Sequence, residues 1–180
     1  MNLPNTITVS RLLVLPILFG LLADPTDNRR WWATGLFCLA ALTDWLDGYL
    51  ARKLDQVTDL GKFLDPLVDK FLVLGPLLLL IQWQLLPAWA VFLILGRELA
   101  IAGWRINPQL AGQTTIVGAN LWGKLKTVTQ IIAIALLLAP LPDPGEAIGL
   151  LMFWLAVILT LISGGFYLWP LMPGKPSAVS

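Results

Sequence analysis

Six apolar stretches, each about as long as a membrane-spanning helix, limit what this chain can fold into. They cover residues 7–23, 31–51, 62–82, 87–106, 124–139 and 146–168, and the fifth is expected to begin earlier, near residue 117. A helix of ~20 residues crosses the ~30 Å hydrocarbon core of a bilayer, where backbone polar groups must be satisfied within the helix. The sequence therefore predicts an all-α integral membrane protein with six transmembrane helices.

Composition agrees with this prediction. The 180 residues are 57% apolar and only 13% charged, whereas soluble domains carry about 25% charged residues. The chain has no histidine, which excludes imidazole metal sites and histidine bases, and its single cysteine excludes an intrachain disulfide. Its net charge of +1 gives no indication of nucleic-acid binding. No signal peptide is evident, because the first apolar run is long and carries Arg11 near its start.

The organisation of the chain is simple. No internal repeat or second domain is visible, so residues 1–180 are expected to form a single transmembrane domain. Met1–Thr6 is polar and is expected to form a short interfacial segment before the first helix.

The basic residues predict an orientation. With six spans both termini lie on one side of the membrane, and only Arg29 and Arg30 fall on the other side. The side with the termini holds the other ten basic residues: Arg11, Arg52, Lys53, Lys62, Lys70, Arg97, Arg105, Lys124, Lys126 and Lys175. Cytoplasmic segments carry the excess of Lys and Arg, so both termini are expected in the cytoplasm.

Four aspartates lie in these apolar surroundings: Asp44, Asp47, Asp65 and Asp69. The first two are spaced i,i+3 and the last two i,i+4, so each pair lies on one face of a helix. An Asp deep in a membrane helix costs roughly 2.5–3.5 kcal/mol, and four cost on the order of 10 kcal/mol before they repel one another. Cations must neutralise them, either the Arg and Lys nearby in a salt-bridge network or metal ions. Two divalent metals fit best, because an all-oxygen donor set suits hard cations such as Mg²⁺.

The depth of these aspartates predicts a polar cavity. At ~1.5 Å per residue, Asp44 lies ~12 Å deeper than Arg52. With the orientation above, the cavity faces the cytoplasm a few helical turns below the membrane surface, where a lipid substrate can enter sideways.

Residues 44–69 read D-x2-D-G-x2-A-R-x8-G-x3-D-x3-D without a departure. This pattern resembles the signature of the CDP-alcohol phosphotransferase family, membrane enzymes that join an alcohol to a CDP-activated lipid and release CMP. The resemblance implies that Asp44, Asp47 and Asp65 are metal ligands. It also implies that Asp69 is both a ligand and the general base that deprotonates the incoming hydroxyl. The implied cofactor is two divalent ions, Mg²⁺ or alternatively Mn²⁺, and members of the family are typically homodimers.

The same signature implies contacts to CDP-diacylglycerol. Gly48 and Ala51 are small and let the nucleotide approach the helix backbone. Arg52 would contact the diphosphate through its guanidinium fork, and Thr58 would contribute a hydroxyl. Gly61 would leave room for substrate at the start of the third helix.

A second group of polar residues lies on the fourth and fifth apolar stretches. Residues 2–11 (N-L-P-N-T-I-T-V-S-R), the Arg97-Glu98 pair, and the G-K-x-K-T-x-x-Q run from residue 123 are similar to the branch of the family that synthesises phosphatidylglycerophosphate. This similarity implies that the phosphate of glycerol 3-phosphate is held by Arg97, Arg105, Lys124 and Lys126. The alternative is that these cations only anchor helix ends at the membrane surface. For Arg97, a buried pair with a neighbouring acid such as Glu98 is favoured over simple anchoring.

The resemblance implies an activity. The phosphatidyl group of CDP-diacylglycerol would pass to glycerol 3-phosphate in a bacterial cytoplasmic (inner) membrane, giving phosphatidylglycerophosphate and CMP. The same chemistry with phosphatidylglycerol, inositol phosphate or serine as acceptor stays open. A rival from another class is a divalent-cation transporter with the aspartates as its permeation site, which would not need Gly48, Ala51 and Arg52 at fixed offsets. The expected partners are the two substrates and membrane lipids, with no nucleic acid.

Overall fold

The computed structural model of the protein describes residues 3–54, 59–106 and 117–168. Side chains are described for residues 13–43, 68, 70–103 and 122–165. These parts of the chain form six α-helices and no strand: α1 (Leu3–Leu22), α2 (Asp27–Leu54), α3 (Asp59–Gln82), α4 (Ala88–Ile106), α6 (Val117–Leu138) and α7 (Gly145–Leu168). The prediction of an all-α chain with six long helices is confirmed.

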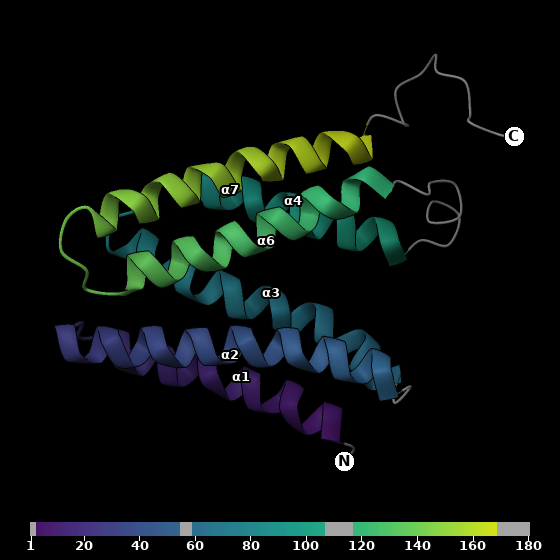
Figure 1. Ribbon diagram of the computed structural model, residues 1–180, viewed down its shortest axis with the longest axis horizontal. Coiled ribbons are helices and arrows are strands. Elements are labelled where there is room, and N and C mark those ends of the chain that lie inside the picture. Colours follow the sequence, from purple (N-terminus) through teal and green to yellow (C-terminus); the bar gives the residue numbers. More distant parts are fainter. Residues whose placement is uncertain (1–2, 55–58, 107–116, 169–180) are drawn as a thin grey trace, which may run out of the picture.

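Successive helices run in alternating directions along the bundle (Figure 1). The start of α1 and the end of α7 therefore lie at the same end of the molecule. α1 packs against α2 and α3, α6 packs closely against α7, and α3 and α6 touch across the middle. α4 packs against α7 and α3.

By length and composition, one helix among the described residues could cross a membrane, namely Gly145–Gly165 within α7. Leu13–Leu22 and Lys70–Gln82 are shorter apolar helices. That all six helices span a membrane therefore stays a prediction.

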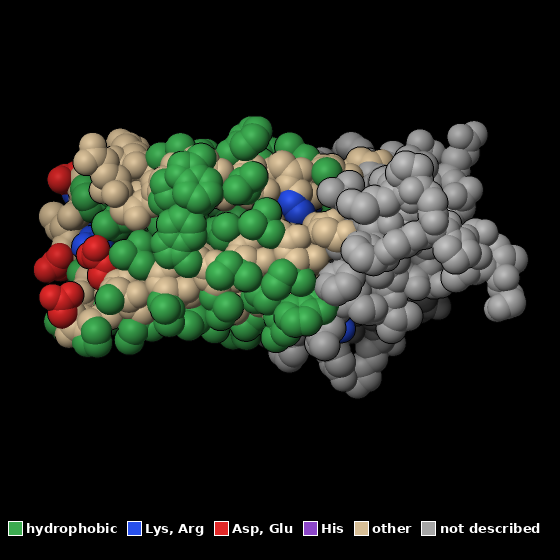
Figure 2. All heavy atoms as spheres, turned by 90° about the horizontal axis from the view of Figure 1, so that it is seen from above, with side chains coloured by type: hydrophobic (Ala, Val, Ile, Leu, Met, Phe, Trp, Pro, Cys, Tyr) green, Lys and Arg blue, Asp and Glu red, His purple; other side chains and the backbone are tan. Residues whose placement is uncertain are grey.

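Large hydrophobic side chains cover much of the described surface (Figure 2). Among them are Trp89 and Phe92 on α4, and Leu151, Ile158 and Leu161 on α7, each more than half exposed. Among the described side chains, exposed acids gather at one end of the bundle (Figure 2), here called the acidic end: Asp24, Asp27, Asp143 and Glu146. An apolar belt of this extent is typical of helices that face lipid.

α1, α2 and α3 begin three or four residues before the apolar stretches that predict them. α1 starts at Leu3, so the predicted interfacial segment over Met1–Thr6 is helical from Leu3 onward, and its place at a membrane surface stays a prediction. Proline is tolerated in a first helical turn, where its missing N–H has no partner to lose, so Pro4 can lie inside α1. α2 likewise starts at Asp27, whose carboxylate is favourable at the positive end of the helix dipole.

Small residues allow α7 to approach α6 closely. A Cβ added at Gly149 would lie 2.9 Å from Cδ2 of Leu137 and 3.2 Å from Cβ of Leu136, so a side chain there would clash. The buried face of α7 continues from Gly149 at helical spacing through Phe153, Ala156, Thr160 and Ser163. Faces rich in small residues are a common way to pack helices in membranes.

Arg30 ties three parts of the chain together at the acidic end. Its guanidinium donates to the carbonyls of Leu138 at 3.0 Å and of Leu137 and Ala139 at 3.2 Å each. It also lies 5.3 Å from the ring centroid of Trp83 in the turn between α3 and α4. The last carbonyls of a helix lack partners within it, and a cation there is favourable to the dipole. The start of α2 is thereby fixed to the end of α6.

Replacing Arg30 tests this role in stability. We expect Arg30→Met to lower the free energy of unfolding by about 2–4 kcal/mol, because bonds from a charged donor to three carbonyls are lost. For a chain of this length that is a fall of roughly 5–15 °C in the denaturation midpoint, measured in detergent. Arg29→Met is the matched control, because Arg29 is exposed and its ion-pair partner among the described residues is the exposed Asp24, at 3.0 Å. Equal midpoints for the two variants would contradict the role of Arg30.

Candidate active site

The predicted metal-binding aspartates lie on two adjacent helices. Asp44 and Asp47 are on α2, and Asp65 and Asp69 are on α3. The two helices touch and run in opposite directions (Figure 1). Each predicted pair is helical, so its two members share a helix face. The side chains of all four lie outside the described part, so the site is placed by the backbone of the two helices.

These positions place the aspartates at matched heights. Asp44 lies ten residues before the last residue of α2, and Asp69 lies ten residues after the first residue of α3. Asp47 and Asp65 lie seven and six residues from the same helix ends. At ~1.5 Å per residue, one aspartate from each helix is about 15 Å from this end and one is about 10 Å from it.

This donor set fits divalent metal ions. It offers four carboxylates and no imidazole, since the chain has no histidine, and oxygen-only donors suit Mg²⁺ or Mn²⁺. Among the side chains that are described, no group of three or more His, Cys, Asp or Glu forms a competing site.

The residues expected to contact CDP-diacylglycerol follow the aspartates toward the same end. Gly48, Ala51 and Arg52 are on the last turns of α2, and Gly61 is in the first turn of α3. Their side-chain environments are outside the described part, as is the whole of Thr58.

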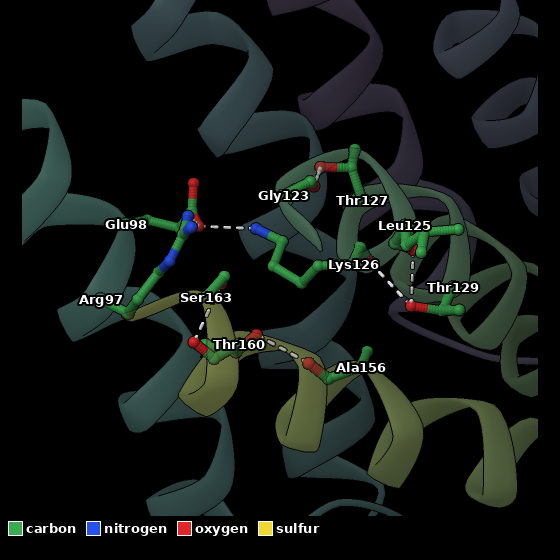
Figure 3. A network of polar contacts seen from close by, with 10 residues as sticks. All are labelled: Arg97, Glu98, Gly123, Leu125, Lys126, Thr127, Thr129, Ala156, Thr160 and Ser163. Carbon is green, nitrogen blue, oxygen red and sulfur yellow. Dashed lines mark hydrogen bonds and ion pairs between the residues drawn. The ribbon is translucent and has the colours of Figure 1, made fainter. Parts of the chain in front are cut away.

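A second cluster joins α4 to α6. Oε1 of Glu98 accepts hydrogen bonds from Nη1 of Arg97 and from Nζ of Lys126, both at 2.6 Å (Figure 3). The predicted pairing of Arg97 with Glu98 is confirmed. The contact between Glu98 and Lys126, 28 positions further along the chain, could not be read from the sequence. The only signal for it is that an acid in an apolar stretch needs a cation.

Lys126 is almost completely buried, with 4% of its surface exposed. Arg97 lies close to two glycines: a Cβ at Gly164 of α7 would be 3.4 Å from Cγ of Arg97, and one at Gly123 would be 4.0 Å from its Nη2. The three charged groups of the cluster together carry +1.

The cluster borders a cavity of about 40 Å³ between α3, α4 and α6. Its polar lining comes from Lys70, Glu98, Lys126, Thr127 and Gln130. The rest of its wall is apolar: Val73, Leu74, Leu77, Val91, Ile94 and Leu95. The cavity therefore has a polar, charged end and an apolar floor.

The polar end of this pocket lies at the height of the aspartates. Lys70 directly follows Asp69 on α3. Glu98 lies eight residues before the end of α4, and Lys126 nine residues after the start of α6. At ~1.5 Å per residue, Glu98 and Lys126 therefore lie about 12 and 14 Å from the same end of the bundle as the aspartates.

Of the four cations predicted to bind the acceptor, the structure brings two together. Arg97 and Lys126 share the carboxylate of Glu98. Lys124 is exposed and is not among the residues that line the cavity, which favours the anchoring alternative for this residue. Arg105 is in the last turn of α4, and its side chain is outside the described part.

Comparison with known proteins identifies the family of the chain. The profile of the CDP-alcohol phosphatidyltransferase family matches residues 1–162. The chain belongs to this family. The resemblance inferred from residues 44–69 is therefore confirmed, and the match covers the aspartates, Glu98 and Lys126 alike. As a member of a family of phosphatidyltransferases, the protein is an enzyme.

Several curated relatives align over nearly the full chain. A Bacillus subtilis (strain 168) protein is 44% identical over 181 residues, covering 92% of this chain and 93% of the relative. A Pseudomonas fluorescens protein is 40% identical, covering 96% and 87%, and a Haemophilus influenzae protein is 33% identical, covering 90% and 89%. All three are named CDP-diacylglycerol–glycerol-3-phosphate 3-phosphatidyltransferase.

Proposed function

We propose that the protein transfers the phosphatidyl group of CDP-diacylglycerol to glycerol 3-phosphate. The observation that carries this proposal is the complete aspartate signature on two adjacent helices, with a cation-lined pocket at the same height. Relatives named for this reaction, 33–44% identical over about nine tenths of the chain, support the choice of acceptor.

In the proposed reaction, a hydroxyl oxygen of glycerol 3-phosphate forms a bond to the phosphorus of the phosphatidyl group. The bond from that phosphorus to the CMP oxygen breaks, and CMP leaves with the electron pair. Asp69 takes the hydroxyl proton as general base. Bringing the hydroxyl within ~3–3.5 Å of the phosphorus is the main task of the acceptor pocket.

Asp44, Asp47, Asp65 and Asp69 would hold two divalent ions, Mg²⁺ or Mn²⁺. When bound, such ions offset the negative charge of a diphosphate and of the leaving oxygen. The nucleotide end of the donor lipid would be contacted by residues on either side of these aspartates: Gly48, Ala51, Arg52, Thr58 and Gly61.

The acceptor needs cations of its own. Glycerol 3-phosphate carries about two negative charges, and the CDP diphosphate next to it is also negative. The proposed phosphate ligands are Arg105 and Lys126, supported by Arg97. The burial of Lys126 in the wall of the pocket supports its place in this set.

We further propose that residues 1–180 form one domain whose six helices all cross a bacterial cytoplasmic membrane. The active site and both termini would face the cytoplasm, since six spans would put ten of the twelve basic residues on the side of the termini. A homodimer is proposed from the family resemblance.

Product identification tests the proposal. Purified protein is given CDP-diacylglycerol with Mg²⁺ and, in separate reactions, glycerol 3-phosphate, phosphatidylglycerol, inositol phosphate or serine. We expect phosphatidylglycerophosphate and an equimolar amount of CMP with glycerol 3-phosphate, identified by mass spectrometry. A lipid product formed only with another acceptor would contradict the proposed substrate. Metal flux into liposomes without CMP release would favour a transporter.

The role of Asp69 as the base is tested separately. We expect Asp69→Asn to lower turnover by about 10²–10⁴-fold, because proton removal is lost, while CDP-diacylglycerol binding stays within a few-fold of wild type. Asp143→Asn, at the exposed acidic end, is the control and should behave as wild type. If Asp69→Asn loses nucleotide binding and its turnover is only mildly reduced, Asp69 is a ligand and not the base.

A further inference from the structure

The hydrogen bond between Glu98 and Lys126 joins α4 to α6, two helices whose backbones are not in close contact. α4 packs against α7 and α3, whereas α6 packs against α7, α2 and α3. Over the described residues of the two helices, no Cα atom of α4 lies within 8 Å of one of α6. Two long side chains nevertheless meet at 2.6 Å and join the helices beside the cavity (Figure 3).

The carboxylate of Glu98 also holds two cations at one oxygen. Nη1 of Arg97 and Nζ of Lys126 each lie 2.6 Å from Oε1, so the two positive groups are close to one another. Their side chains are only 14% and 5% exposed, and that of Glu98 is 24% exposed. Water screens such partly buried charges weakly, so without the carboxylate the two cations would repel each other.

We propose that Glu98 is a positioning residue for the acceptor, an inference that rests on the proposed function. It fixes the ammonium of Lys126, and with it the guanidinium of Arg97, at the wall of the pocket before the phosphate of glycerol 3-phosphate binds. Lysine has a long, flexible side chain, and holding it in advance removes the entropy cost of ordering it at binding. Such preorganisation increases affinity for the phosphate without any contact between phosphate and Glu98.

A role in folding alone does not account for this arrangement. The helices that enclose the pocket also meet through the buried hydrophobic cluster, which includes Leu77 of α3, Ile94 of α4 and Ile134 of α6. The carboxylate instead faces the cavity together with Lys126. Its removal is therefore expected to change acceptor binding more than the stability of the bundle.

Acceptor kinetics of three variants test the inference. Glu98→Gln keeps the size of the side chain and removes its charge, and we expect it to raise the apparent KM for glycerol 3-phosphate by about ten-fold or more. The KM for CDP-diacylglycerol should stay within about two-fold. Glu98→Asp keeps the charge on a shorter stem and should give an intermediate KM. In a Lys126→Met background, Glu98→Gln should raise KM by less than about three-fold, because Glu98 acts mainly through Lys126.

Glu146→Gln, an exposed acid in the first turn of α7, is the control and should have wild-type constants. An unchanged or lowered KM for glycerol 3-phosphate in Glu98→Gln would overturn the inference, as would an equal effect in both backgrounds. If Glu98→Gln does not yield folded protein, Glu98→Asp decides, and an unchanged KM in that variant would overturn it. A wild-type enzyme that does not use glycerol 3-phosphate contradicts the proposed function as well, whereas an active wild type with an unaffected variant contradicts only the role of Glu98.

Discussion

The structure depends on how a bundle with an apolar surface accommodates four carboxylates. In a membrane, Asp44, Asp47, Asp65 and Asp69 without compensation would cost on the order of 10 kcal/mol, comparable to the whole stability of a typical domain. The antiparallel pairing of α2 and α3 brings two aspartates to each of two heights, where shared cations can offset them. The same concentration of negative charge explains why an acceptor phosphate would need separate cations, supplied by α4 and α6.

The two ends of the bundle have different tasks. At the acidic end, Arg30 satisfies the last carbonyls of α6 and lies against Trp83, so this end is held by fixed polar contacts. At the other end lie the aspartate motif and the pocket with Glu98 and Lys126. Between α4 and α6 that pocket is bridged by the side chains of Glu98 and Lys126. Stabilising contacts and proposed chemistry are thus separated along the bundle.

Local sequence patterns predict those features of the structure that depend only on residues close together in the chain. The apolar stretches predict six helices, and the aspartate spacing predicts helical pairs on α2 and α3. α1 begins at Leu3, whereas the first apolar stretch begins at residue 7. The polar residues of Met1–Thr6 do not indicate a helix, and Pro4 is tolerated there because it lies in a first helical turn. The bonds from Arg30 to α6 and from Glu98 to Lys126 join residues far apart in the chain, and they depend on packing that no local pattern contains. For the same reason the motif does not distinguish the buried Lys126 from the exposed Lys124.

Counting bound metal tests the central claim, that the aspartates form a two-metal site, most directly. Purified wild-type protein and an Asp44→Asn/Asp65→Asn variant are equilibrated with Mn²⁺, and bound ions are measured by electron paramagnetic resonance and elemental analysis. We expect two ions per chain in the wild type, and fewer in the variant together with a loss of transferase activity. Full activity in excess chelator, or a wild type that binds no more Mn²⁺ than the variant, would contradict a metal site at these aspartates.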